Sequence, residues 1–117
     1  MSDSDLNINC WILGNSSDEV FSVKISRGEN VDALKVAINL REGNTLPAKS
    51  LILYKVSIPY SPQLAEDAAA LGPNRLKLKP LDVLSEVFAN ELDRKHVHVI
   101  VEIPFGTWVY IVLSSLR

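Results

Sequence analysis

The sequence predicts an α+β fold, in which one main amphipathic helix packs across a mixed β-sheet, with one or two short helices besides. Two observations lead to this prediction. Several segments alternate apolar and polar residues with a period of two, which is typical of half-buried strands. One longer segment among them places its apolar residues at helical spacing. With 117 residues, 47% hydrophobic and 22% charged, the chain suits a single domain with a modest core.

Residues 6–13 and 20–26 predict a β-hairpin at the start of the chain. The intervening Gly-Asn-Ser-Ser-Asp has the composition of a turn. Cys10 lies in the alternating pattern of the first strand, where a free cysteine usually behaves as a small buried hydrophobe. The residues that share the apolar faces are Leu6, Ile8, Cys10 and Ile12 in the first strand and Phe21, Val23 and Ile25 in the second.

The main helix is predicted to begin after Asn30. Asparagine is a favourable N-cap residue, and Asp32 suits the positive end of the helix dipole. We expect the helix to end near Gly43, because glycine readily takes the left-handed conformation that follows many helices. The stripe expected to pack on the sheet consists of Val31, Leu34, Ala37 and Ile38.

Residues 50–59 are the most informative strand of the sequence. They are rich in β-branched and aromatic residues, and Pro59 closes them. Leu51 and Leu53 alternate with a second apolar set on the opposite face, so both faces need cover. We therefore place this strand inside the sheet, with Leu51 and Leu53 in the core.

The apolar residues on the opposite face of this strand are Ile52, Tyr54 and Val56, and two alternatives remain open for the role of that face. It could form an exposed patch that binds a partner, because exposed apolar patches often mark interfaces. It could instead be covered by residues 57–70.

The segments after the central strand predict shorter elements. Residues 63–71 are alanine-rich and favour a helix, which Gly72 and Pro73 stop. Residues 75–80 alternate and predict a short edge strand whose lysines protect the edge. One or two helical turns are expected in residues 81–88, from the spacing of Leu81, Leu84 and Phe88.

Residues 96–104 predict a strong final strand. One face is expected to carry Val97, Val99, Val101 and Ile103, and the other His96, His98, Ile100 and Glu102. The resulting order of hairpin, helix, strand, irregular section, short helix and strand is that of the β-grasp, or ubiquitin-like, architecture. This architecture places the first and last strands side by side and parallel.

The sequence offers no recognisable catalytic machinery, so we predict that the chain is not an enzyme. His96 and His98 share a strand face and could bind a metal if a third ligand converged, but a polar outer face is the simpler interpretation. Cys10 paired with a histidine as nucleophile and base is disfavoured by its core position. We expect no metal and no cofactor. The net charge of −2 gives no electrostatic case for nucleic acid.

Ordered motifs from about Leu6 to Pro104 resemble the N-terminal domain of Crinkler effector proteins, in its fungal form. The central Leu-Ile-Leu-Tyr-Lys-Val-Ser-Ile-Pro of residues 51–59 is similar to the leucine-aromatic signature of that family. The oomycete form of the signature has a lysine where this chain has Ser57. The other segments that carry the resemblance are residues 9–14, 20–25, 31–35, 84–88 and 96–101.

The resemblance implies a non-enzymatic, ubiquitin-like header domain that is associated in this family with secretion or entry into a host cell. In the family, a separate C-terminal domain carries the toxic activity. The residues that the signature marks for partner binding or translocation are Leu51, Leu53, Tyr54, Lys55 and Val56. The alternative is an intracellular ubiquitin-like module that binds a protein partner through the face of Ile52, Tyr54 and Val56.

We divide the chain into a disordered start (residues 1–5), the ubiquitin-like domain (6–104) and an apolar tail (105–117) that is an extra strand or an aberrant C-terminus. The tail is far shorter than the roughly 20 residues of a membrane span, and we expect no toxin domain in this polypeptide.

The resemblance implies a secreted or host-cell location; the lack of a signal peptide otherwise favours the cytoplasm or nucleus. The expected partner is a host or self protein, with no nucleic acid and no small-molecule substrate.

Overall fold

The computed structural model describes residues 5–43, 50–72, 75–90 and 92–103. Residues 1–4 and the apolar tail at 105–117 lie outside the described residues, whereas Asp5 belongs to the first strand and not to a disordered start. The elements in chain order are β1 (Asp5–Ile12), η2 (Ser17–Glu19), β2 (Phe21–Ser26), α1 (Val31–Arg41), β3 (Ile52–Pro59), α2 (Leu64–Leu71), β4 (Leu76–Lys77), α3 (Leu84–Val87) and β5 (His96–Glu102).

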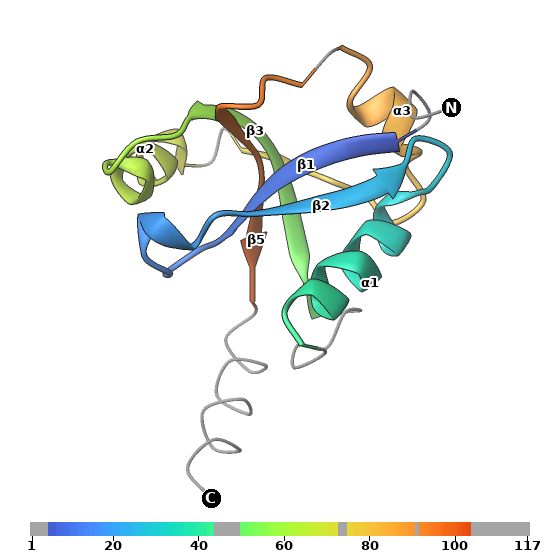
Figure 1. The fold of residues 1–117 in the computed structure, drawn as a ribbon, viewed down its shortest axis with the longest axis horizontal. Coiled ribbons are helices and arrows are strands. Elements are labelled where there is room, and N and C mark those ends of the chain that lie inside the picture. Colours follow the sequence, from blue (N-terminus) through green and yellow to red (C-terminus); the bar gives the residue numbers. More distant parts are fainter. Residues whose placement is uncertain (1–4, 44–49, 73–74, 91, 104–117) are drawn as a thin grey trace, which may run out of the picture.

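The strands form one mixed sheet in the order β2-β1-β5-β3-β4. β1 pairs antiparallel with β2, which confirms the predicted hairpin. β1 also pairs parallel with β5, so the first and last strands lie side by side as the β-grasp prediction required. β4 is the predicted short edge strand, and Figure 1 shows α1 and α2 on opposite sides of the sheet.

The main core lies between α1 and one face of the sheet. Asn30 caps α1, because its side chain accepts a hydrogen bond of 2.9 Å from the backbone N–H of Ala33. Gly43, with φ of +79°, takes the left-handed conformation just beyond the helix, as expected. Cys10, Leu51 and Leu53 are fully buried in this core, with exposed fractions of 0%, 1% and 0%.

A smaller second core lies on the opposite face, beneath α2. Leu64 and Ala68 of α2 are buried there against Trp11, Ile58 and Ile100. The indole N–H of Trp11 donates to the carbonyl of Ser16 at 3.1 Å, so its polar end is satisfied. The middle of the sheet is therefore covered on both faces. The outer strand β2 has one face towards the main core, whereas both residues of β4 are exposed.

The alternation predicted for β5 fails at Val97, which belongs to the second core and not to the first. The cause is an irregular register: β3 advances three residues from Lys55 to Ile58 while β5 advances only two, from Val99 to Val97. Since paired residues share a face, Val97 follows its partner Ile58 into the second core.

The helical stripe predicted at residues 81–88 is also shorter than expected. Leu84 and Phe88 are buried, but Leu81 is 82% exposed because it precedes the single turn of α3. The carbonyls on either side of Leu81, from Pro80 and Asp82, accept hydrogen bonds from the first N–H groups of α1. This stretch is thus held against the start of α1 as a turn.

Candidate functional site

The signature strand is β3, and its two leucines are core residues. Tyr54, on the opposite face, donates a hydrogen bond from its hydroxyl to Oε1 of Glu102 at 2.7 Å. The guanidinium carbon of Arg75 lies 4.5 Å from the centre of the Tyr54 ring. The hydrogen bond to Glu102 and burial raise the pKa of Tyr54 above its ordinary value. Tyr54 therefore connects β3 to β5 and to the chain before β4.

The predicted exposed patch is half-buried in the structure. Tyr54 and Val56 pack against the second core beneath α2, and Ile52 has intermediate exposure. Of the two alternatives for this face, cover by the segment after β3 is the one observed for Tyr54 and Val56. Lys55 is the exposed member of the signature, with its Nζ 5.9 Å from the ring centre of Phe88. Partner binding by these residues stays a prediction.

His98 does not lie on a polar outer face, since its exposed fraction is only 3%. Its Nδ1 accepts a hydrogen bond from the backbone N–H of Asn9 at 2.9 Å. Its Nε2 lies 2.7 Å from the carbonyl oxygen of Asp93. Burial lowers the pKa of His98 below its ordinary value, although the hydrogen bond to Asp93 acts in the opposite direction. The ring is a structural part of the junction between β1 and β5.

His96 occupies a different environment, at the surface. Its Nδ1 is 2.8 Å from the hydroxyl of Ser57, and its Nε2 is 3.8 Å from Oδ2 of Asp93. Among the residues that the structure describes, no three His, Cys, Asp or Glu side chains gather as metal ligands would. Burial raises the pKa of Cys10 far above its ordinary value, which makes its thiol a poor nucleophile.

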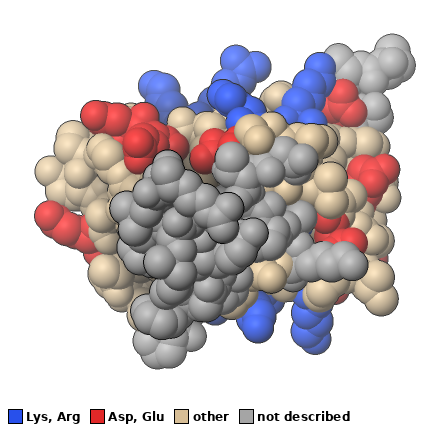
Figure 2. Space-filling view, turned by 90° about the horizontal axis from the view of Figure 1, so that it is seen from below, with Lys and Arg blue, Asp and Glu red and all other residues tan. Residues whose placement is uncertain are grey.

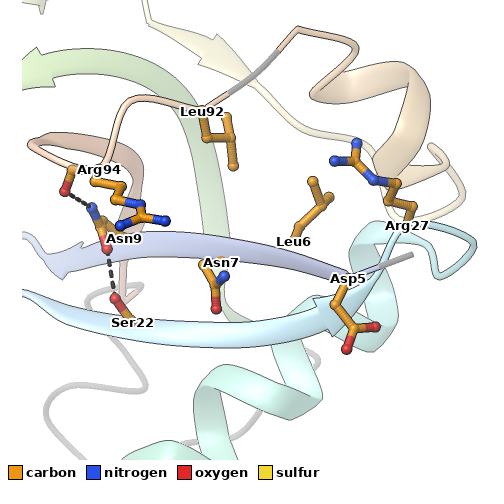
Figure 3. A pocket seen from close by; sticks show the side chains of 8 residues that line it. All are labelled: Asp5, Leu6, Asn7, Asn9, Ser22, Arg27, Leu92 and Arg94. Atoms are coloured by element: carbon orange, nitrogen blue, oxygen red, sulfur yellow. Dashed lines mark hydrogen bonds between the residues drawn. The ribbon is translucent and has the colours of Figure 1, made fainter. Parts of the chain in front are cut away.

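A surface pocket of about 380 Å³ opens beside β1, β2 and the chain before β5 (Figure 3). The guanidinium groups of Arg27 and Arg94 stand at its two ends and point towards its middle, with Asn7 between them. Its lining consists of Asp5, Leu6, Asn7, Asn9, Ser22, Arg27, Leu92 and Arg94.

Asn9 organises the wall of this pocket. Its Oδ1 accepts a hydrogen bond of 2.6 Å from the hydroxyl of Ser22. Its Nδ2 donates to the carbonyl oxygens of Arg94 and His96, at 2.9 and 2.8 Å. One side chain thus joins β2, β1 and the chain before β5, and it holds the backbone that carries Arg94 in place.

A second pocket, of about 420 Å³, shares Asn9 and Arg94 with the first. Val20, Tyr60 and Val97 give it apolar walls, and Asp18, Lys95 and His96 complete the lining. Sequence reasoning missed both pockets. The available signal was Asn7 and Asn9, because asparagine is depleted in strands and here occupies two outward positions of one strand.

The charges around the first pocket are of both signs. Arg27 and Arg94 flank it, while the carboxylate of Asp5 lies 3.8 Å from Nζ of Lys24 and is partly neutralised. On the face drawn in Figure 2, Lys and Arg side chains stand along two opposite margins and acidic side chains lie among them. Among the described residues drawn in colour on that face, neither sign gathers into a large patch.

Comparisons with known proteins agree with the architecture. A family model described as the Crinkler effector protein N-terminal domain matches residues 6–102. The C-terminal ubiquitin-like domain of mouse tubulin-specific chaperone e is similar in structure, with a TM-score of 0.56 at 12% identity, covering 86% of this chain and 88% of that one. An Arabidopsis thaliana protein, solved by combining evolutionary couplings with sparse NMR data, has a TM-score of 0.55 at 19% identity and the same coverage.

These structural similarities show an α+β fold of the β-grasp, ubiquitin-like type. A search of curated proteins finds no match. Within the described ranges, no helix combines the length and the apolar character needed to cross a membrane.

Proposed function

The chain belongs to the family of Crinkler effector protein N-terminal domains, and we propose that it acts as a non-enzymatic header domain for delivery into a host cell. The match of the family model over residues 6–102, nearly the whole ubiquitin-like domain, is the observation that carries this proposal. Secretion or translocation is the role that the family resemblance implies for such a domain.

The packing of β3 restricts how the signature could take part in delivery. Leu51 and Leu53 are 1% and 0% exposed, so a receptor cannot contact their side chains while the domain stays folded. Lys55 is the signature residue most open to a partner, beside the half-buried Tyr54 and Val56. Recognition during delivery therefore involves Lys55 and the surrounding surface, or it follows unfolding of the sheet.

Delivery is tested by the uptake of a fluorescently tagged domain into cultured plant and animal cells. Protease added outside the cells removes the signal from domain that is bound only to the surface. We expect protected fluorescence above that of a tagged, unrelated ubiquitin-like domain of similar size. Protected fluorescence at the level of that control in every cell type contradicts the delivery role.

A second function, an intracellular protein-interaction module, is supported by the arginine-flanked pocket of Figure 3. Arginine forms bidentate hydrogen bonds with carboxylates, so Arg94, which is exposed at the end of the pocket opposite Arg27, suits an acidic side chain of a peptide. Asn7 is exposed between them and can bond to a peptide backbone. This moves the interaction surface from the half-covered Ile52, Tyr54 and Val56 to the polar face of β1 and β2.

The interaction role is tested with a displayed library of acidic and neutral peptides. We expect the wild-type domain to enrich acidic peptides, and Arg94→Glu to bind the selected peptide at least about tenfold more weakly, as for the loss of a charge-assisted bond. Lys79→Glu is the matched control, because Lys79 is an exposed cation that lines a different pocket. Equal weakening by both variants would indicate general charge attraction and contradict a specific site.

A further inference from the structure

We propose that His98 is a pH-sensitive latch, whose protonation in mildly acidic solution releases the start of β5 from β1. The latch consists of the His98 ring, the backbone N–H of Asn9 and the carbonyl of Asp93. It is independent of the delivery and interaction roles proposed above, because it rests on contacts within the domain alone.

The hydrogen bonds of the ring determine its protonation state. The backbone N–H of Asn9 can only donate, so Nδ1 of His98, 2.9 Å away, carries no proton. The carbonyl of Asp93 can only accept, so Nε2, 2.7 Å away, carries the proton. The folded domain thus holds a neutral ring in one tautomer. A second proton, on Nδ1, would set two N–H donors against each other.

The ring also takes the place of backbone pairing between the two strands. β1 and β5 pair in register from Cys10 and Val99 onward, and Asn9 is the residue just before this point. At this position the N–H of Asn9 donates its hydrogen bond to the imidazole of His98 instead of to a backbone carbonyl. Protonation would leave this part-buried N–H without its acceptor, and a donor that loses its partner away from bulk water costs free energy.

The charged groups around the ring do not compensate for a second proton. His98 shares a pocket with Lys55 of β3, His96 of β5 and Asp93 of the preceding turn, and β1 contributes the neutral Asn9. The same turn carries Arg94 and Lys95. Burial is the main cause that lowers the pKa of His98, the charge of His96 adds to it, and the carbonyl and carboxylate of Asp93 oppose it. The balance favours the neutral ring.

The contacts beside the latch define which segment it would release. The carbonyls of Arg94 and His96 accept hydrogen bonds from the Asn9 side chain, and the carbonyl of Lys95 accepts one from the N–H of Tyr60 at 2.8 Å. Residues 93–98 therefore form one strip held to β1 and to the end of β3. Release of this strip would alter both pockets that contain Arg94.

The sign of the pH dependence follows from the lowered pKa of His98 in the folded state. In the opened state the ring has an ordinary pKa of about 6.5. Below that pH, opening takes up one proton, so the opening equilibrium rises by up to about tenfold for each pH unit. The rise stops once the pH falls below the pKa of the folded state.

Native-state hydrogen exchange of the Asn9 amide, corrected for intrinsic exchange, tests the latch. We expect its opening equilibrium to rise by up to about tenfold per pH unit below about 6.5 in the wild type, and to be independent of pH in His98→Gln. His96→Gln is the control and should keep the rise below about 6.5, because its ring bonds to Ser57 and not to Asn9. The rise should stop at a higher pH than in the wild type, since the charge of His96 no longer lowers the pKa of His98. An equal rise at the Leu34 amide in α1 would mean global unfolding and overturn the latch.

A second measurement on the wild type covers the case in which His98→Gln does not fold. Ring ¹⁵N shifts report the tautomer and the titration of each histidine directly. We expect His98 to carry its proton on Nε2 and to titrate below about 6.5, the ordinary value for histidine. A ring that is already charged at that pH, or that carries its proton on Nδ1, would overturn the proposal.

Discussion

At the scale of single residues, polar side chains of the sheet form contacts between distant segments that the apolar pattern of the sequence does not predict. Asn9 bonds to β2 and to the chain before β5, and its backbone N–H bonds to His98. Tyr54 bonds to Glu102 and stacks with Arg75. In each case one side chain connects segments that are distant in the sequence, so its replacement affects several contacts at once.

Tyr54→Phe should destabilise the domain by about 1 kcal/mol. The change removes the hydroxyl that donates to Glu102 at 2.7 Å and keeps the ring against Arg75. Hydrogen bonds to charged groups contribute more than this on average, but water competes at a half-buried site, which gives about 1 kcal/mol. Urea denaturation measures the loss.

Tyr60→Phe is the matched control, since the Tyr60 side chain is 50% exposed, and we expect little change in its free energy of unfolding. If Tyr54→Phe unfolds at the same urea concentration as the wild type, the bond between Tyr54 and Glu102 does not stabilise the fold.

At the scale of elements, β3 and β5 show why a regular alternation is an incomplete guide in the centre of a sheet. β5 lies between β1 and β3, and residues 97–101 are all buried. A strand covered on both faces has no polar face by which its register could be read. The shift between Lys55 and Ile58 therefore left no signal in the sequence, and it moved Val97 to the second core.

The signature strand should respond to mutation as a structural element. Leu53→Ala should cost about 3 kcal/mol, because it opens a cavity at a fully buried site. Lys55→Ala should cost less than about 0.5 kcal/mol, because Lys55 is exposed. The free energies of unfolding of the two variants, from urea denaturation, check this contrast.

The same two variants separate structural from functional effects in the uptake experiment. If uptake depends on the folded surface of β3, Lys55→Ala should reduce it while the stability stays unchanged. Loss of uptake in Leu53→Ala alone would reflect unfolding. A small stability cost for Leu53→Ala would contradict the placement of this residue in the core.

At the scale of the whole molecule, the sheet divides the domain into two unequal cores. α1 covers one face, and α2 covers part of the other, which leaves the polar face of β1 and β2 open beside the chain before β5 (Figure 1). The pocket of Figure 3 lies in this opening, and it combines residues from the first and last thirds of the chain. The latch at His98 borders the same region.

The sequence by itself predicted the main strands and helices, their order and the β-grasp fold, because strand and helix periodicities, caps and turns are local properties. The place of Leu51, Leu53 and Cys10 in the core was also predictable, since each lies in a clear alternating pattern. The signature of β3 further pointed to the family that the comparison shows.

Only the tertiary structure decided what the polar and half-apolar residues do. Tyr54 and Val56 became half-buried because α2 packs on their face, and His98 became buried because β5 lies in the middle of the sheet. The pocket with Arg27 and Arg94 at its ends is lined by residues that lie far apart in the sequence. Such juxtapositions come from long-range strand pairing, of which a local sequence pattern contains no record.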